Sequence, residues 1–250
     1  MYAQVLVASD GLETKYGSPT SDWERFFVWE GIFSDDDVEV QQIDDVHSKY
    51  IYKGEELTSL EILIKGLFKK EHFTEYLQDF IFFLRSGETY NKMIAMYHQF
   101  YTVKKAIERT KKCVLEGGSP EERRIGVVWH TQGSGKSITM MFTVRAMYHD
   151  PELKKFKIVF ITDRKELQKQ LKETSKSIGF TVNLAGSIKE FQDFLKTDTP
   201  DLVMGMVHKF QERELKKEFP VLNESPNILI MIDEAHRTQY KLLGANLRVA

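Results

Sequence analysis

The sequence predicts an α/β protein in which a mostly parallel sheet, covered by helices on both faces, follows a smaller region that we expect to be mainly helical. Two observations support this prediction. In the second half of the chain, short apolar runs alternate with helical segments, the pattern of parallel strands joined by crossover helices. In the first half, apolar residues recur at intervals of three and four, which is typical of helices that bury one face.

The composition is that of a globular protein and excludes several classes. The chain has 250 residues, 42% of them apolar, enough for one large or two modest domains. Its formal net charge of −2 excludes a uniformly basic protein, so any nucleic-acid binding must come from a local patch. The single cysteine, Cys113, permits no intramolecular disulfide and fits a reducing compartment. Because we find neither a leader peptide nor a membrane-spanning apolar run, we expect a cytoplasmic protein without membrane contact.

Residues 1–88 are expected to form a connector with a strand first and helices after it. A buried strand is predicted at 4–9, where an apolar run ends at an Asp-Gly turn. The aromatic run from Trp23 to Phe33 is interpreted as packing, because the three aspartates after it would repel the phosphates of nucleic acid. Apolar spacing then predicts two helices, over about 57–68 and 73–84.

Residues 89–250 are expected to form the second domain. Its first element is a long helix over about 90–115, which a polar loop ends. Helical segments are then predicted to begin near Ser137, Arg164, Ile188 and His208. They alternate with four apolar strands, predicted at 125–129, 157–162, 202–206 and 228–232.

A glycine-rich turn joins the first of these strands to the helix after it. Gly133 and Gly135 let successive N–H groups converge on an anion, and the following helix adds the positive end of its dipole. Lys136 would then contact the β- and γ-phosphates, and the hydroxyl of Ser137 would hold Mg²⁺. The usual pattern opens with Gly or Ala, and here His130 stands in that place. The turn predicts nucleotide binding, the alternative being a glycine-rich turn that merely contains a lysine.

Two carboxylates end the last apolar strand. Hydrolysis of a nucleoside triphosphate requires a metal anchor and a group that acts on the attacking water. Asp233 would hold the metal, and Glu234 would act on the water. In the alternative interpretation the Asp-Glu pair only caps a helix. The phosphate loop earlier in the same strand-helix alternation argues against that alternative.

Together the two motifs resemble the first motor domain of superfamily 2 helicases and translocases, a RecA-like P-loop NTPase domain with a DEAH box. Longer segments are similar to the restriction (R) subunit of type I restriction-modification enzymes, namely 128–141, 162–164, 208–210 and 233–240. In that subunit a histidine is expected at position 130, so His130 supports the resemblance. Segments 4–11 and 16–18 resemble the stretch between its nuclease and motor domains.

The resemblance implies a role for each matching residue. ATP phosphates are bound by the loop residues Thr131, Gly133, Ser134, Gly135, Lys136 and Ser137. Mg²⁺ is held by Ser137 and Asp233, while catalysis involves Lys136, Glu234 as the water-activating base and His236 as the link to neighbouring motor elements. Gln99 resembles the glutamine that reads adenine, the alternative being an ordinary polar helix residue. DNA contacts are implied for Arg164, Lys165, His208 and Lys209, with a solvated helix start as the alternative for the first two.

The implied function is ATP-dependent translocation of double-stranded DNA, as the motor portion of a type I restriction endonuclease that works with methylase (M) and specificity (S) subunits. No Glu-x-Lys in the chain has a convincing nuclease setting, so we expect the nuclease core to lie outside it. We also expect the second motor domain, with its arginine finger, to be absent, which would leave the isolated chain nearly inactive. The alternatives are another superfamily 2 motor, such as a type III restriction or repair helicase, and a non-catalytic nucleotide-binding module that docks on the other subunits.

Overall fold

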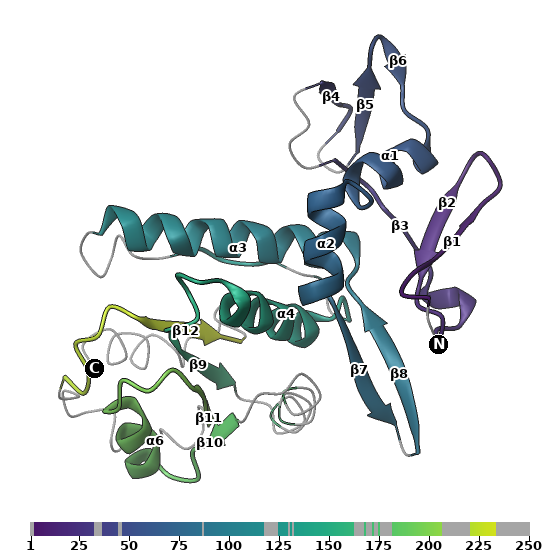
Figure 1. Cartoon of the computed structure of the whole chain (residues 1–250). Coiled ribbons are helices and arrows are strands. Elements are labelled where there is room, and N and C mark those ends of the chain that lie inside the picture. Colours follow the sequence, from purple (N-terminus) through teal and green to yellow (C-terminus); the bar gives the residue numbers. More distant parts are fainter. Residues whose placement is uncertain are drawn as a thin grey trace. The chain divides into compact units, whose positions relative to one another are not determined.

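The computed structural model of the chain describes residues 3–32, 37–44, 47–86, 88–117, 125–129, 131, 133–162, 168, 172, 175, 182–206 and 221–233 (Figure 1). The chain divides into two compact units, Met1–Lys104 and Lys105–Ala250. The division falls inside helix α3 (Tyr97–Glu116). No helix in the described ranges has both the length and the apolar character needed to cross a membrane.

In the described part of the first unit, three antiparallel sheets, two α-helices and one 3₁₀ helix precede α3. One sheet consists of β1 (Leu6–Ser9), β2 (Thr14–Gly17) and β3 (Phe27–Val28), with the 3₁₀ helix η1 (Trp23–Arg25) before β3. The second consists of β4 (Val38–Gln42), β5 (Ser48–Tyr52) and β6 (Glu55–Glu56), and the third is the hairpin β7 (Ile81–Ser86) and β8 (Thr89–Ile94). Between the second and third sheets the chain forms α1 (Ser59–Gly66) and α2 (Lys70–Asp79).

The hairpin corrects our expectation of a mainly helical connector. The helix predicted at 73–84 ends at Asp79, and the helix predicted from residue 90 begins at Tyr97. The apolar run Phe80–Leu84 fits a strand as well as a helix, and cross-strand pairing decides between them, with Ile81 opposite Ile94. The predicted first strand is present as β1, but Leu6 and Val7 are exposed rather than buried.

An aromatic cluster forms the core of the first unit. Trp29 is 1% exposed, and its ring contacts the rings of Tyr16, Tyr76, Tyr97, Phe100 and Tyr101. Its indole N–H donates to the carbonyl oxygen of Gly31 at 2.8 Å. The prediction that the aromatic run packs internally is confirmed at Trp29, whereas Trp23 of the same run lies on the surface, stacked on Phe26.

A parallel four-stranded sheet forms the centre of the second unit, as predicted. Its order is β10 (Val182–Leu184), β11 (Leu202–Met206), β9 (Lys157–Thr162) and β12 (Ile228–Ile232), and every neighbouring pair is parallel. The predictions for 157–162, 202–206 and 228–232 are confirmed with the same bounds. Strand β10 was not predicted, because its three residues are too few to show a pattern.

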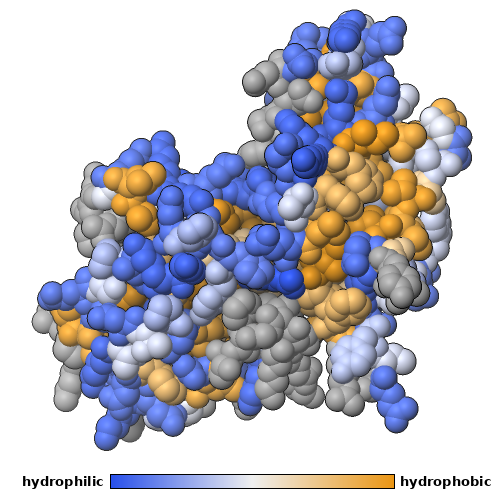
Figure 2. Space-filling view, in the orientation of Figure 1, coloured by the Kyte–Doolittle hydropathy of each residue, from blue (hydrophilic) through white to orange (hydrophobic). Residues whose placement is uncertain are grey.

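Helices pack on both faces of this sheet. Side chains of alternate strand residues point to opposite faces. On one face, α4 (Lys136–His149) packs through Met141, Val144 and Met147 against a cluster that includes Ile158, Phe160, Leu202 and Met204. On the other, α6 (Ile188–Leu195) packs through Phe191 and Leu195 against Val159, Ile161 and Val203. The second unit is therefore a three-layer α/β/α structure, and Figure 2 shows that its visible surface is mainly hydrophilic.

The strand predicted at 125–129 is not formed. These residues have no regular secondary structure, and Val127 and Trp129 are 86% and 88% exposed. Gly126 has a φ of +144°, a conformation that L side chains rarely adopt and that interrupts an extended run. The apolar sequence fits a buried strand, but an apolar run becomes a strand only where a neighbouring strand completes its hydrogen bonds. Among the strands described, β12 is at the edge of the sheet, and residues 125–129 do not extend the sheet beyond it.

Candidate nucleotide-binding site

The glycine-rich turn leads into α4 as predicted. Gly133 and Gly135 have φ values of +86° and +77°, in the left-handed region that favours glycine. A Cβ on Gly133 would have no atom within 4 Å, so the backbone conformation and not crowding accounts for the glycine. The turn is closed by Ser134, whose N–H and hydroxyl donate to the carbonyl oxygen of Thr131 at 3.3 and 2.7 Å.

The N-terminus of α4 has the properties of an anion site. Gly135 occupies the N-cap position and provides no side-chain cap for the N–H groups of the first turn. That turn contains no acidic residue, and Lys136 and Ser137, its first two residues, are both partly exposed. Because the N-cap residue supplies no side-chain cap, the N–H groups of the first turn and the helix dipole together favour a bound anion such as phosphate. The residues present therefore fit the phosphate groups of a nucleotide.

The connection between α4 and β9 shows which edge of the sheet the turn faces. A short segment, 150–156, joins the C-terminal end of α4 to the start of β9, and Tyr148 lies near Asp201, which precedes β11. The C-terminal end of α4 is therefore at the amino edge of the sheet. With 14 residues α4 is about 21 Å long, similar to the roughly 20 Å of β9. The N-terminus of α4 thus lies toward the carboxyl edge of the strands.

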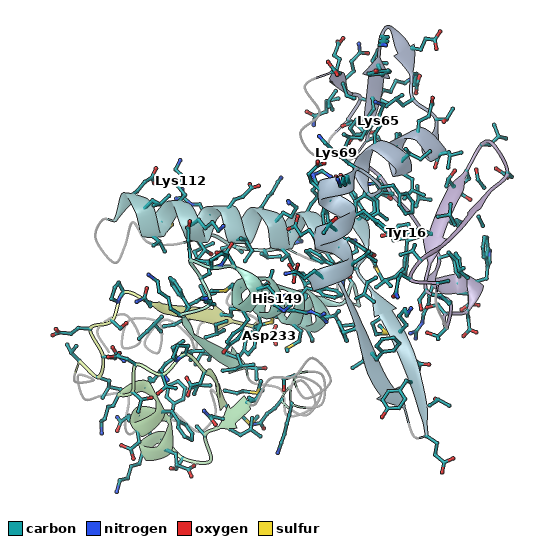
Figure 3. The ribbon with its side chains drawn as sticks, in the orientation of Figure 1. Tyr16, Lys65, Lys69, Lys112, His149 and Asp233 are labelled. Carbon is teal, nitrogen blue, oxygen red and sulfur yellow. The ribbon has the colours of Figure 1, made fainter. Side chains whose placement is uncertain are left out.

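Asp233 lies at this carboxyl edge, directly after β12 (labelled in Figure 3). It is 9% exposed, and its main-chain N–H donates to the carbonyl oxygen of Ile161 at 2.9 Å. Its Oδ2 accepts a bond of 3.4 Å from the hydroxyl of Thr162, the last residue of β9. From β9 the chain continues to β10 and β11 on one side, and β12 lies on the other side. Ligands of open α/β sheets bind at such a switch point, outside the carboxyl ends of the strands.

Gln99 has a structural contact in the first unit. It is 2% exposed, and its Oε1 accepts a bond of 2.9 Å from the N–H of Met96, just before α3 begins. This contact caps the start of α3, in line with the alternative that Gln99 is a polar helix residue. The remaining predicted site residues lie outside the described residues: His130, Arg164, Lys165, His208, Lys209, Glu234 and His236.

Sequence reasoning missed a polar cluster at the opposite, amino edge of the sheet. Lys157, the first residue of β9, is 1% exposed, and its ammonium donates to Asp201 Oδ1 at 2.5 Å and to Thr197 Oγ1 at 3.2 Å. The other carboxylate oxygen of Asp201 accepts a bond of 2.9 Å from the side-chain amide of Asn183. Burial and then the Asp201 carboxylate raise the pKa of the nearby Tyr148 phenol. The sequence feature that could have indicated this cluster is a lysine at the start of one apolar strand together with an aspartate just before another.

Sequence comparisons identify similar proteins. The model of the SWI2/SNF2 ATPase family matches residues 98–250. A Methanocaldococcus jannaschii protein, named as a type I restriction enzyme MjaIXP endonuclease subunit, is 51% identical over 100% of this chain and 24% of its own length. The type I restriction enzyme HindI endonuclease subunit of Haemophilus influenzae is 37% identical over 96% of this chain and 22% of its own length. The chain thus spans about a quarter of the length of the curated relatives it matches.

Proposed function

We propose a function from the premise that this chain belongs to the SWI2/SNF2 ATPase family and is a segment of an endonuclease (R) subunit of a type I restriction enzyme. The chain binds ATP with Mg²⁺, and in the whole subunit it supplies the part of the motor that holds the nucleotide phosphates. The observation that supports this most is the uncapped N-terminus of α4, preceded by two left-handed glycines and turned toward the sheet edge that carries Asp233.

Each described residue of the site contributes a different interaction. The N–H groups at the start of α4 bind phosphate oxygens, and the ammonium of Lys136 balances their negative charge. Ser137 and Asp233 offer a hydroxyl and a carboxylate, the oxygen ligands that Mg²⁺ takes alongside water and phosphate. When bound, Mg²⁺ neutralises charge that develops on the phosphate oxygens. Glu234 follows Asp233 directly, and we assign to it the positioning and deprotonation of the attacking water.

The remaining assignments extend the proposal to DNA and to partner subunits. Arg164, Lys165, His208 and Lys209 contact the backbone of double-stranded DNA, and His236 links the nucleotide site to neighbouring motor elements. In the assembled enzyme, methylase and specificity subunits are the protein partners, and ATP hydrolysis drives translocation of DNA. These assignments rest on the matching motifs, and adenine recognition by Gln99 has the same basis.

Replacing the phosphate-loop lysine tests the proposal. We expect Lys136→Ala, placed in the whole endonuclease subunit assembled with methylase and specificity subunits, to abolish ATP-driven translocation, because the phosphates lose their cation. Assembly with the other subunits should be retained, since Lys136 is a partly exposed residue at the start of α4. The measurements are nucleotide binding, the displacement of a DNA triplex by the moving motor, and complex formation by gel filtration.

Lys155→Ala is the matched control. Lys155 is an exposed lysine in the connection between α4 and β9, at the opposite edge of the same sheet. This variant should translocate at the wild-type rate. Undiminished translocation by Lys136→Ala would reject the motor function of this site and favour the docking module instead.

A further inference from the structure

We propose that Thr162 is a positioning residue for Asp233, whose hydroxyl orients the carboxylate that holds Mg²⁺. The inference rests on the proposed function, since it assumes that Asp233 is a metal ligand. In the structure the hydroxyl of Thr162 contacts the carboxylate of Asp233, a residue of the proposed nucleotide site.

The register of the sheet brings the two side chains together. In the parallel pair β9 and β12, Ile161 lies opposite Ile232, so the next position along each strand holds Thr162 and Asp233. The bond from the Asp233 N–H to the Ile161 carbonyl oxygen continues the ladder one residue past β12 and fixes the main chain of Asp233. The orientation of the carboxylate then depends on side-chain contacts, and the hydroxyl of Thr162 on the neighbouring strand provides one.

Thr162 carries a hydroxyl group at a buried position. All six residues of β9 are buried, and Thr162 is 1% exposed. Valine has nearly the same shape and suits a buried strand equally well, so packing alone does not require the hydroxyl. A buried hydroxyl requires a hydrogen-bond partner, and Asp233 Oδ2 is within reach at 3.4 Å. Because strong O–H···O bonds measure 2.5–3.0 Å, we expect this one to affect orientation more than stability.

Metal affinity is the property that this contact should change. Residues that orient a metal ligand without touching the metal typically alter the affinity by 10–100-fold when they are replaced. Mg²⁺ is sensitive because it demands near-ideal octahedral geometry and is held by few protein groups. We expect Thr162 to act on the metal through Asp233 and not on the nucleotide phosphates at the N-terminus of α4. The two contributions can therefore be measured separately.

The test measures ATP binding by the full chain in EDTA and over a series of Mg²⁺ concentrations. In Thr162→Val, the Mg²⁺ concentration that gives half of the metal-dependent gain in affinity should rise about tenfold. Affinity for ATP in EDTA should not change. Thr162→Ser, which keeps the hydroxyl, should restore the wild-type Mg²⁺ dependence. In an Asp233→Asn background, Thr162→Val should have no further effect, because the ligand it orients is gone.

Thr110→Val is the matched control for the loss of a buried hydroxyl. Thr110 is 4% exposed in the same unit, and its hydroxyl donates to the carbonyl oxygen of Ala106 at 2.7 Å, within α3. Its Mg²⁺ dependence should be that of the wild type. A wild-type Mg²⁺ dependence in folded Thr162→Val would overturn the inference. If this variant does not fold, equal Mg²⁺ dependence in Thr162→Ser and Thr162→Ala overturns it instead. A wild-type chain that binds no ATP would reject the proposed function itself.

Discussion

The ion pair at the amino edge of the sheet gives a prediction about stability that is independent of the nucleotide site. The side chains of Lys157 and Asp201 are 2% and 18% exposed, so the pair lies almost entirely out of water. Asp201→Ala would leave the Lys157 ammonium buried with Thr197 Oγ1 as its remaining partner and would remove the acceptor of the Asn183 amide. Because removing one partner leaves a buried charge without its counter-charge, we expect the free energy of unfolding to fall by about 3–5 kcal/mol.

Urea unfolding monitored by circular dichroism measures this change. Hydrogen–deuterium exchange at the amides of β9 and β11 shows whether it is confined to the second unit. Asp193→Ala is the matched control, because it breaks the Lys196–Asp193 pair at the C-terminal end of α6, whose side chains are 55% and 53% exposed. An exposed pair of this kind contributes less than about 1 kcal/mol. Equal losses of stability in the two variants would refute the idea that burial gives the Lys157–Asp201 pair its importance.

Two further predictions concern Asp150 and Gln99. Burial alone would raise the pKa of the Asp150 carboxyl, but the Lys111 ammonium and the N–H groups of Glu152 and Leu153 hold it below its usual value of 3.8. The carboxylate therefore contributes its full stabilisation above the unfolded pKa and loses it as the pH falls through the folded pKa. We expect wild type to have a higher thermal midpoint than Asp150→Asn at pH 7, and we expect this difference to disappear in acid. For Gln99→Ala we expect a loss of about 1 kcal/mol from the uncapped start of α3 and, if Gln99 also reads adenine, a weaker preference for ATP over GTP in competitive binding. An unchanged preference would reject adenine recognition by Gln99.

The parts of the fold that could be predicted are those whose pattern is local. Strands β9, β11 and β12 are short apolar runs, and their bounds followed directly from the sequence. The hairpin β7–β8 could not be distinguished from helix, because the pairing of Ile81 with Ile94 decides it and such pairing is not visible in either segment alone. At 125–129 the apolar run predicted a strand, and the backbone at Gly126 departs from that geometry.

The candidate site likewise contains some features that the sequence predicts and others that it does not. Gly133 and Gly135 are predictable, because the left-handed backbone of the turn requires glycine whatever surrounds it. The contact between Thr162 and Asp233 is not predictable, since it depends on which strands are neighbours and on their register. The sequence placed Asp233 at a strand end correctly.

Polar residues at the two edges of the sheet should affect different properties of the protein. At the amino edge, both carboxylate oxygens of Asp201 accept bonds from side-chain N–H groups, so the cluster satisfies itself and contributes to folding. At the carboxyl edge, Asp233 and the uncapped N-terminus of α4 present negative and positive groups that suit a cation and an anion. Asp201→Ala should therefore lower stability without changing the Mg²⁺ dependence of ATP binding. Thr162→Val should change the Mg²⁺ dependence of ATP binding without lowering stability. A variant at one edge that changed both properties would show that the two edges are coupled through β9, the strand that contains both Lys157 and Thr162.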